Sequence, residues 1–129
     1  MRLADLQFSS QDGLVIARVL GEIDMSNAAE LAKAVTDATP NDAIGIVLDL
    51  SDIDYVDSAG IHLVYRLRES LRARGQSFTL VVPDHSPVID ALRLAGIERN
   101  LDVAGTMSAA LAEALGSGSA GEAAPSNGA

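Results

Sequence analysis

The amino-acid sequence predicts an α/β domain with a small mixed β-sheet, in which an antiparallel first edge strand is followed by parallel strands and about four helices flank the sheet. Two observations carry this prediction. An Asp-Gly dipeptide separates the first two short apolar segments, and such a turn is typical of an antiparallel hairpin. Beyond the hairpin, extended apolar segments alternate with segments of helical period, which indicates parallel strands joined by right-handed crossovers.

The first half of the chain supplies the hairpin, one helix and the central strand. The hairpin strands are predicted at residues 3–8 and 14–20, on either side of a polar turn. A helix follows, capped by Ser26 or Asn27, and its apolar positions keep helical spacing at Ala28, Leu31, Ala32 and Val35. Residues 44–50 then form an almost unbroken apolar run, which is typical of a strand buried on both faces.

A serine follows this central strand at the start of the next helix. Between the strand and the helix, the sequence predicts a short acidic loop that contains Asp52, Asp54 and Asp57. Ser58 is predicted to be the N-cap of the helix. Gly75 ends this helix, whose core-facing stripe is Gly60, Val64, Leu67 and Leu71. The end of the central strand therefore brings one hydroxyl group into a cluster of carboxylates.

The last third of the chain predicts one more strong strand and two helices. The strand covers residues 78–82, and the short helix after it has Ser86 as its N-cap and Pro87 at its first position. Residues 97–103 are predicted to form a weak extended segment. Thr106 caps a last helix, whose apolar positions are Met107, Ala110, Leu111 and Leu115.

The end of the domain is predicted at Leu115. A chain of 129 residues has the length of one domain with a hydrophobic core. Residues 116–129 are rich in Gly, Ser and Ala and contain no large apolar residue, so they are expected to be a disordered tail. The folded domain is therefore predicted to cover residues 1–115.

Composition and charge exclude several classes of function. The chain has no cysteine, so it has no disulfides, thiolate metal ligands or cysteine nucleophile. Its net charge is −9, and residues 1–60 carry three basic and eleven acidic side chains. An acidic surface argues against nucleic acid and anionic membranes as partners, and favours a basic protein surface. We find neither a membrane-spanning apolar stretch nor a signal peptide, which favours a cytoplasmic protein.

The position of Ser58 is compatible with two roles. In the first, its hydroxyl only caps the helix, a contribution of about 1 kcal/mol to stability. In the second, Ser58 is a regulatory phosphoacceptor, because the dipole and the free N–H groups of a helix N-terminus favour a phosphate. A phosphate would add roughly −1.5 to −2 charges beside Asp57, with Asp54 and Asp24 nearby. That charge would repel a protein docked on this face, so it would act as a switch.

Two catalytic alternatives rest on weaker patterns. A serine hydrolase needs a general base, but the sequence has only His62 and His85 and lacks a Gly-x-Ser-x-Gly motif. The aspartates around Ser58 could bind a hard metal ion, but they lack the spacing of a calcium loop. No glycine-rich phosphate loop is present. We therefore expect neither a metal nor a cofactor.

Three segments of the chain resemble those of a known family. They are Gly21-Glu22-Ile23-Asp24, Leu48-Asp49-Leu50-Ser51 and Tyr55-Val56-Asp57-Ser58-Ala59-Gly60. Together they resemble the STAS domain, specifically the bacterial anti-sigma factor antagonists, over residues 3–115. The resemblance implies a small mixed sheet flanked by helices, and it places the phosphoacceptor of the family at Ser58. Many members have a second serine where this chain has Ala59, which leaves Ser58 as the only hydroxyl in the motif.

The resemblance also implies a regulatory cycle without enzymatic activity of the protein itself. The unphosphorylated antagonist binds an anti-sigma factor that is also a serine kinase, and the sigma factor is thereby released. Phosphorylation of Ser58 ends the binding, and a Ser/Thr phosphatase restores it. The residues expected to bind the partner are Asp24, Asp54, Asp57, Ser58, Ala59, Gly60, Ile61 and Tyr65. The alternatives are a scaffold subunit of a larger stress-signalling complex and a small serine hydrolase.

Overall fold

The computed structural model describes residues 5–120 and contains one mixed sheet with the strand order β1-β2-β3-β4-β5. The strands β1 and β2 pair antiparallel, and all later neighbours pair in parallel. This confirms the predicted sheet. The strands are β1 (Asp5–Gln11), β2 (Leu14–Ile23), β3 (Gly45–Val56), β4 (Ser77–Val81) and β5 (Asp102–Ala104).

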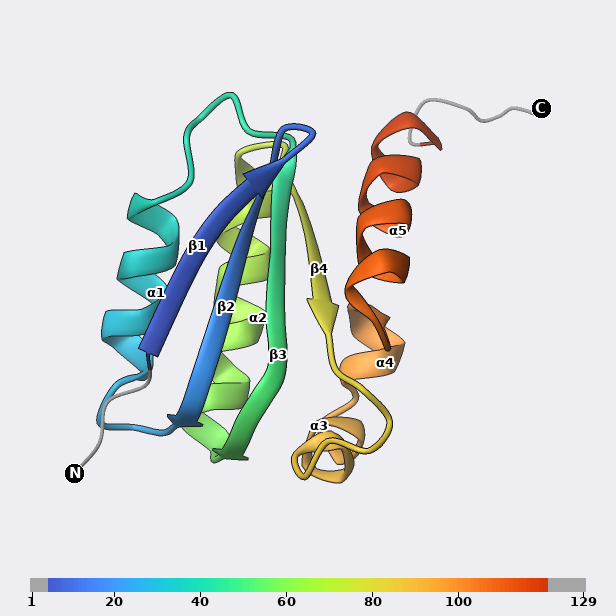
Figure 1. Cartoon of the computed structure of the whole chain (residues 1–129). Coiled ribbons are helices and arrows are strands. Elements are labelled where there is room, and N and C mark those ends of the chain that lie inside the picture. Colours follow the sequence, from blue (N-terminus) through green and yellow to red (C-terminus); the bar gives the residue numbers. More distant parts are fainter. Residues whose placement is uncertain (1–4, 121–129) are drawn as a thin grey trace.

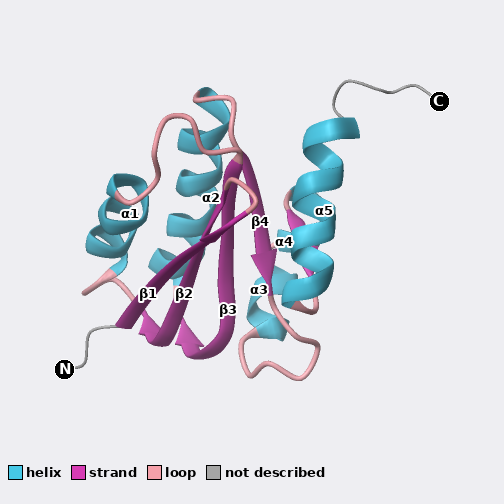
Figure 2. Ribbon diagram, turned by 45° about the horizontal axis from the view of Figure 1, so that its top comes forward, coloured by secondary structure: helices cyan, strands magenta, loops and turns pink. Residues whose placement is uncertain are grey.

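Helices cover both faces of the sheet. The helices α1 and α2 lie side by side behind β1, β2 and β3, and α5 lies beside β4 (Figures 1 and 2). The short helices α3 and α4 connect β4 to β5. The helices are α1 (Ala28–Asp37), α2 (Ser58–Ala73), α3 (Ile89–Leu94), α4 (Ile97–Asn100) and α5 (Met107–Ala120).

The central strand β3 contributes to two hydrophobic cores. Ile46, Leu48 and Leu50 belong to the larger core, together with buried side chains of α1 and α2. Val47 belongs to the smaller core, which includes Ala110 of α5. Successive side chains of a strand point to opposite faces, so a strand between two helical layers needs apolar residues at nearly every position. The apolar run in the sequence has this cause.

The turn between β1 and β2 is tighter than predicted. Asp12 and Gly13 both have positive φ, 55° and 85°, as a two-residue type I′ hairpin requires. Residues 9–11 therefore continue β1 and pair with β2. Residues 3 and 4, with which the sequence prediction began this strand, lie outside the described residues.

The acidic segment after the central apolar run is not a loop. The strand β3 continues through Val56, so Asp52 and Asp54 lie within it. The strand is extended because β2 is extended alongside it, with Tyr55 opposite Glu22 and Val56 opposite Ile23. Pairing with a neighbouring strand stabilises the extended conformation of a segment whose composition favours a loop.

Two predictions for the connection between β4 and β5 were wrong. Ile97, predicted to start an extended segment, instead begins the short helix α4 and is 1% exposed. The extended part is only β5. Val88, not Ser86, precedes α3, and the Ser86 hydroxyl accepts the N–H of Val88 at 3.2 Å in the turn before the helix.

The last helix begins as predicted and continues further. The hydroxyl of Thr106 accepts the N–H of Ala109 at 3.1 Å, which confirms Thr106 as its N-cap residue. The helix α5 continues to Ala120, beyond the predicted domain end at Leu115. The remainder of the predicted tail, residues 121–129, lies outside the described residues.

Candidate functional site

The candidate site lies where β3 ends and α2 begins, at the carboxyl edge of the parallel strands. Asp57 is the N-cap of α2, and its Oδ1 accepts the N–H of Gly60 at 3.1 Å. Ser58 is therefore the first residue of the helix, not its N-cap as predicted. Because Asp57 supplies the cap, the exposed Ser58 hydroxyl is not needed for that purpose.

Asp57 also connects α2 to the segment between β2 and α1. Its second carboxylate oxygen, Oδ2, accepts the N–H of Met25 at 3.2 Å, and its own N–H donates to the carbonyl of Ile23 at 3.2 Å. One side chain thus fixes two chain segments that are distant in sequence. These contacts place the segment that contains Asp24 beside Asp57, at the edge of the sheet where α2 begins.

Asp57→Ala is expected to lower the free energy of unfolding by about 1 kcal/mol, the usual cost of losing an N-cap side chain. Asp54→Ala is the control, because Asp54 is an exposed aspartate three residues earlier in β3, and its replacement should change stability by less than about 0.5 kcal/mol. Urea unfolding of both variants measures the difference. Equal losses would contradict the capping role of Asp57.

The turn that carries Asp24 is held by hydrogen bonds within the segment. Asp24 Oδ1 accepts the N–H of Ser26 at 2.9 Å and also its hydroxyl. The buried Asn27 side chain accepts the N–H of Asp24 at 3.0 Å and donates to the carbonyl of Glu22 at 2.8 Å. Asn27 occupies the N-cap position of α1 but makes no side-chain cap bond, because its amide group is used in this turn.

Two hydrogen bonds from Ser26 lower the pKa of the Asp24 carboxyl, and the bond from the Ser26 hydroxyl has a larger effect than the bond from its backbone N–H. Because this pKa is lower in the folded state than in the unfolded state, the ionised carboxylate stabilises the fold at pH values above the unfolded pKa. This stabilisation is lost as the pH falls through the folded pKa.

Ser26→Ala is expected to move the pKa of Asp24 upward, toward its ordinary value. An NMR titration of the Asp24 carboxyl carbon measures this shift, and an unchanged pKa would show that the hydroxyl is not the cause.

Gly60 permits close packing of α2 against the ends of β2 and β3. A Cβ atom at this position would lie 2.5 Å from Cγ2 of Val56 and 3.0 Å from Cγ2 of Ile23. Both distances are shorter than carbon atoms tolerate without displacement. Glycine at position 60 therefore allows the first turn of α2, with Ser58, to lie close to Ile23 and Val56.

The other predicted contact residues are distributed over a wider area. Ala59 and Ile61 are half-buried next to the larger core. Tyr65 is also half-buried, and its hydroxyl donates to the carbonyl of Ala95 at 3.0 Å. Tyr65 thus connects α2 to the α3–α4 turn and is less available to a partner than its position on the helix suggested.

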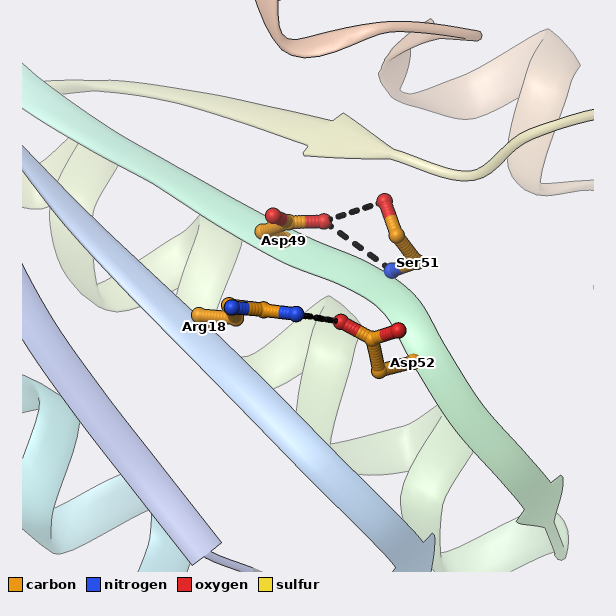
Figure 3. A network of polar contacts seen from close by, with 4 residues as sticks. All are labelled: Arg18, Asp49, Ser51 and Asp52. Carbon is orange, nitrogen blue, oxygen red and sulfur yellow. Dashed lines mark hydrogen bonds and ion pairs between the residues drawn. The ribbon is translucent and has the colours of Figure 1, made fainter.

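Of the acidic residues before the site, Asp52 is already engaged in an ion pair. Its carboxylate pairs with Arg18 of β2, while Asp49 accepts the N–H and the hydroxyl of Ser51 at 2.9 Å and 2.6 Å (Figure 3). This network lies on the strands and not at the N-terminus of α2. Asp54 is exposed in β3.

The structure also reveals three exposed apolar residues that the sequence prediction missed. They are Met25 at 83%, Tyr55 at 49% and Leu94 at 89% exposure, in the β2–α1 connection, at the end of β3 and in α3. Figure 1 shows these three segments at the same end of the molecule as the start of α2. For Met25 the signal was available, because a large apolar residue stands between Asp24 and Ser26 in a polar turn.

No hydrogen bond within residues 5–120 joins Ser58 to His62 or His85, the pairing that would activate a serine nucleophile. In the same range, no group of three His, Asp or Glu side chains is arranged to hold a metal ion. Nor is any helix in the described part of the chain long and apolar enough to cross a membrane.

The mixed five-stranded sheet, and the capped helix that presents a serine at the carboxyl edge of its parallel strands, place the chain in the class of small α/β domains. The family model described as STAS domain matches residues 5–114, and the chain belongs to this family. Anti-sigma-F factor antagonist RsfB of Mycobacterium tuberculosis is 26% identical over 104 residues, which are 80% of this chain and 83% of that protein.

Two further comparisons agree with the family assignment. The putative anti-sigma factor antagonist BtrV of Bordetella bronchiseptica is 28% identical over 102 residues, 78% of this chain and 86% of that protein. The crystal structure of an anti-sigma factor antagonist from Mycobacterium paratuberculosis has the same fold, with a TM-score of 0.77 at 23% identity. The alignment covers 87% of this chain and 94% of that one.

Proposed function

We propose that this protein is a cytoplasmic anti-sigma factor antagonist that works by exchange of partners and not by catalysis. In its unphosphorylated form it binds an anti-sigma factor with serine kinase activity, which frees the sigma factor. Phosphorylation of Ser58 ends the binding, and a Ser/Thr phosphatase reverses it. The names of the related proteins support the antagonist function, and one observation supports Ser58 as the switch: its side chain is exposed at the first position of α2 while Asp57 caps the helix.

The surroundings of Ser58 suit a reversible charge. Backbone N–H groups and the helix dipole at the start of α2 favour a phosphate, so the modification need not unfold the domain. The carboxylates of Asp24 and Asp57 lie on two chain segments, the β2–α1 connection and the start of α2, which the hydrogen bond from Met25 to Asp57 joins. A phosphate therefore adds charge and volume on this face, and the cost of removing that charge from water opposes docking even of a basic partner, while the core is unaltered.

The proposed docking surface combines acidic and apolar groups around Ser58. Asp24, Asp54 and Asp57 provide negative charge, and the exposed Met25 and Tyr55 provide apolar area. Aromatic residues and methionine are enriched in protein interfaces, whereas isolated charges at the rim mainly determine association rate and specificity. The expected partner surface is therefore basic, with an apolar centre.

The test uses the purified protein and Ser58→Ala as baits for the lysate of the source organism. We expect both baits to retain an ATP-binding anti-sigma factor. Addition of ATP should place a phosphate on Ser58, detected by mass spectrometry, and should release the kinase from the wild type but not from Ser58→Ala. Phosphorylation at a different residue, or release from both baits, would rule out Ser58 as the switch.

A further inference from the structure

A groove follows the boundary between α1 and α2 on the outer surface of the helical layer. Its first part, about 230 Å³, starts at Met25 and Ala59, next to Ser58. Its second part, about 380 Å³, continues toward the ends of the two helices at Asp37 and Ser70. The two parts share Ala29, Ala32 and Arg66, so they form one continuous groove.

The groove exists because the residues of α1 that both of its parts share, Ala29 and Ala32, have small side chains. Leu31 and Val35 of α1 are buried in the larger core. Longer side chains at positions 29 and 32 would fill the gap between the helices. The apolar lining from α1 is therefore alanine, and the apolar lining from α2 includes leucines. The apolar lining residues are Ala28, Ala29, Ala32, Leu63 and Leu67. An apolar groove between two helices can accept the apolar face of a third, amphipathic helix.

The charges along the groove differ in sign from those of the whole chain. The net charge of the protein is −9, yet the groove is lined by the cations Lys33 and Arg66, and Asp37 is the only acidic residue of its lining in the described part of the chain. Lys33 donates to Asp37 at 2.6 Å, which neutralises that pair. The ion pairs within residues 5–120 do not include Arg66, so its exposed guanidinium is available to an acidic group from outside.

We propose that the groove binds an acidic amphipathic helix of a partner protein. The apolar face of such a helix would lie on the alanines and leucines, and a carboxylate would pair with Arg66, in the helix-in-groove mode of recognition. The ten residues of α1 form a helix about 15 Å long, which matches roughly three turns of a bound helix. The recognition is opposite in charge to that at the Asp24–Ser58 edge, which the groove adjoins at Met25 and Ala59.

The inference goes beyond the proposed function and is tested without an anti-sigma factor, so its failure would leave the role of Ser58 unaffected. The probe is a fluorescein-labelled helical peptide with leucines on one face and glutamates on both flanks of that face. A second peptide carries lysine at every glutamate position. Fluorescence anisotropy measures binding of both peptides to the full chain, to Arg66→Glu and to Arg72→Glu.

The variant Arg72→Glu is the matched control, because Arg72 is also exposed on α2 and its replacement changes the net charge equally, but it does not line the groove. We expect the glutamate peptide to bind the wild type and Arg72→Glu alike, and to bind Arg66→Glu at least about tenfold more weakly. The proposal would be overturned if the glutamate peptide did not bind, or if both variants weakened its binding equally. It would also be overturned if the lysine peptide bound the wild type and Arg66→Glu equally well.

Discussion

Ser58→Asp is expected to weaken binding of the anti-sigma factor by at least about a hundredfold, while the free energy of unfolding stays within about 0.5 kcal/mol of the wild-type value. The loss of affinity comes from the cost of burying a new negative charge under a docked protein, beside the carboxylates of Asp24 and Asp57. Stability is preserved because an acidic residue in the first turn of a helix interacts favourably with the helix dipole. Titration calorimetry and urea unfolding measure the two quantities.

Ser58→Asn separates charge from size, because asparagine has nearly the shape of aspartate and no net charge. We expect Ser58→Asn to retain most of the affinity if charge is the cause. If both variants lose binding equally, the surface rejects any larger side chain and the phosphate acts by volume. If neither variant loses binding, Ser58 lies outside the interface and the proposed switch is wrong.

Gly60→Ala is expected to destabilise the domain by about 1–2 kcal/mol, which lowers the unfolding midpoint by roughly 4–10 °C. The added methyl group would approach Val56 and Ile23 to 2.5 Å and 3.0 Å, and the carbonyl oxygen of Ile23 to 3.0 Å. Alanine favours the helical conformation by up to about 1 kcal/mol, so the observed loss is the overpacking cost reduced by this gain. Scanning calorimetry measures the midpoint.

Gly116→Ala provides the control for the intrinsic helix preference. Gly116 lies in α5, and a Cβ atom there meets no other atom within 4 Å. We expect Gly116→Ala to leave the midpoint unchanged or to raise it. If Gly60→Ala were equally harmless, α2 could move away from β2 and β3 at little cost, and the position of Ser58 would not depend on this contact.

Several features of the protein could be predicted from the sequence because they depend on local patterns. The apolar run through Ile46 and Leu48 predicts a strand covered on both faces, and the period-matched residues of α1, α2 and α5 predict their helices. The motif around Ser58 likewise predicts a serine at the start of a helix. These patterns depend on the spacing of residues that are close in the chain, so they can be recognised without the tertiary structure.

Other features were decided only by contacts between distant segments. Asp57 and Ser58 are equally good N-cap residues by type, and the hydrogen bonds of Asp57 with Gly60 and Met25 select Asp57. The acidic end of β3 is extended because β2 pairs with it, although its composition favours a loop. The groove between α1 and α2 is likewise a consequence of how two helices pack. The sequence by itself determined the mixed sheet and the order of its main strands and helices, but the cap, the strand end and the groove depend on partners that are adjacent only in the folded chain.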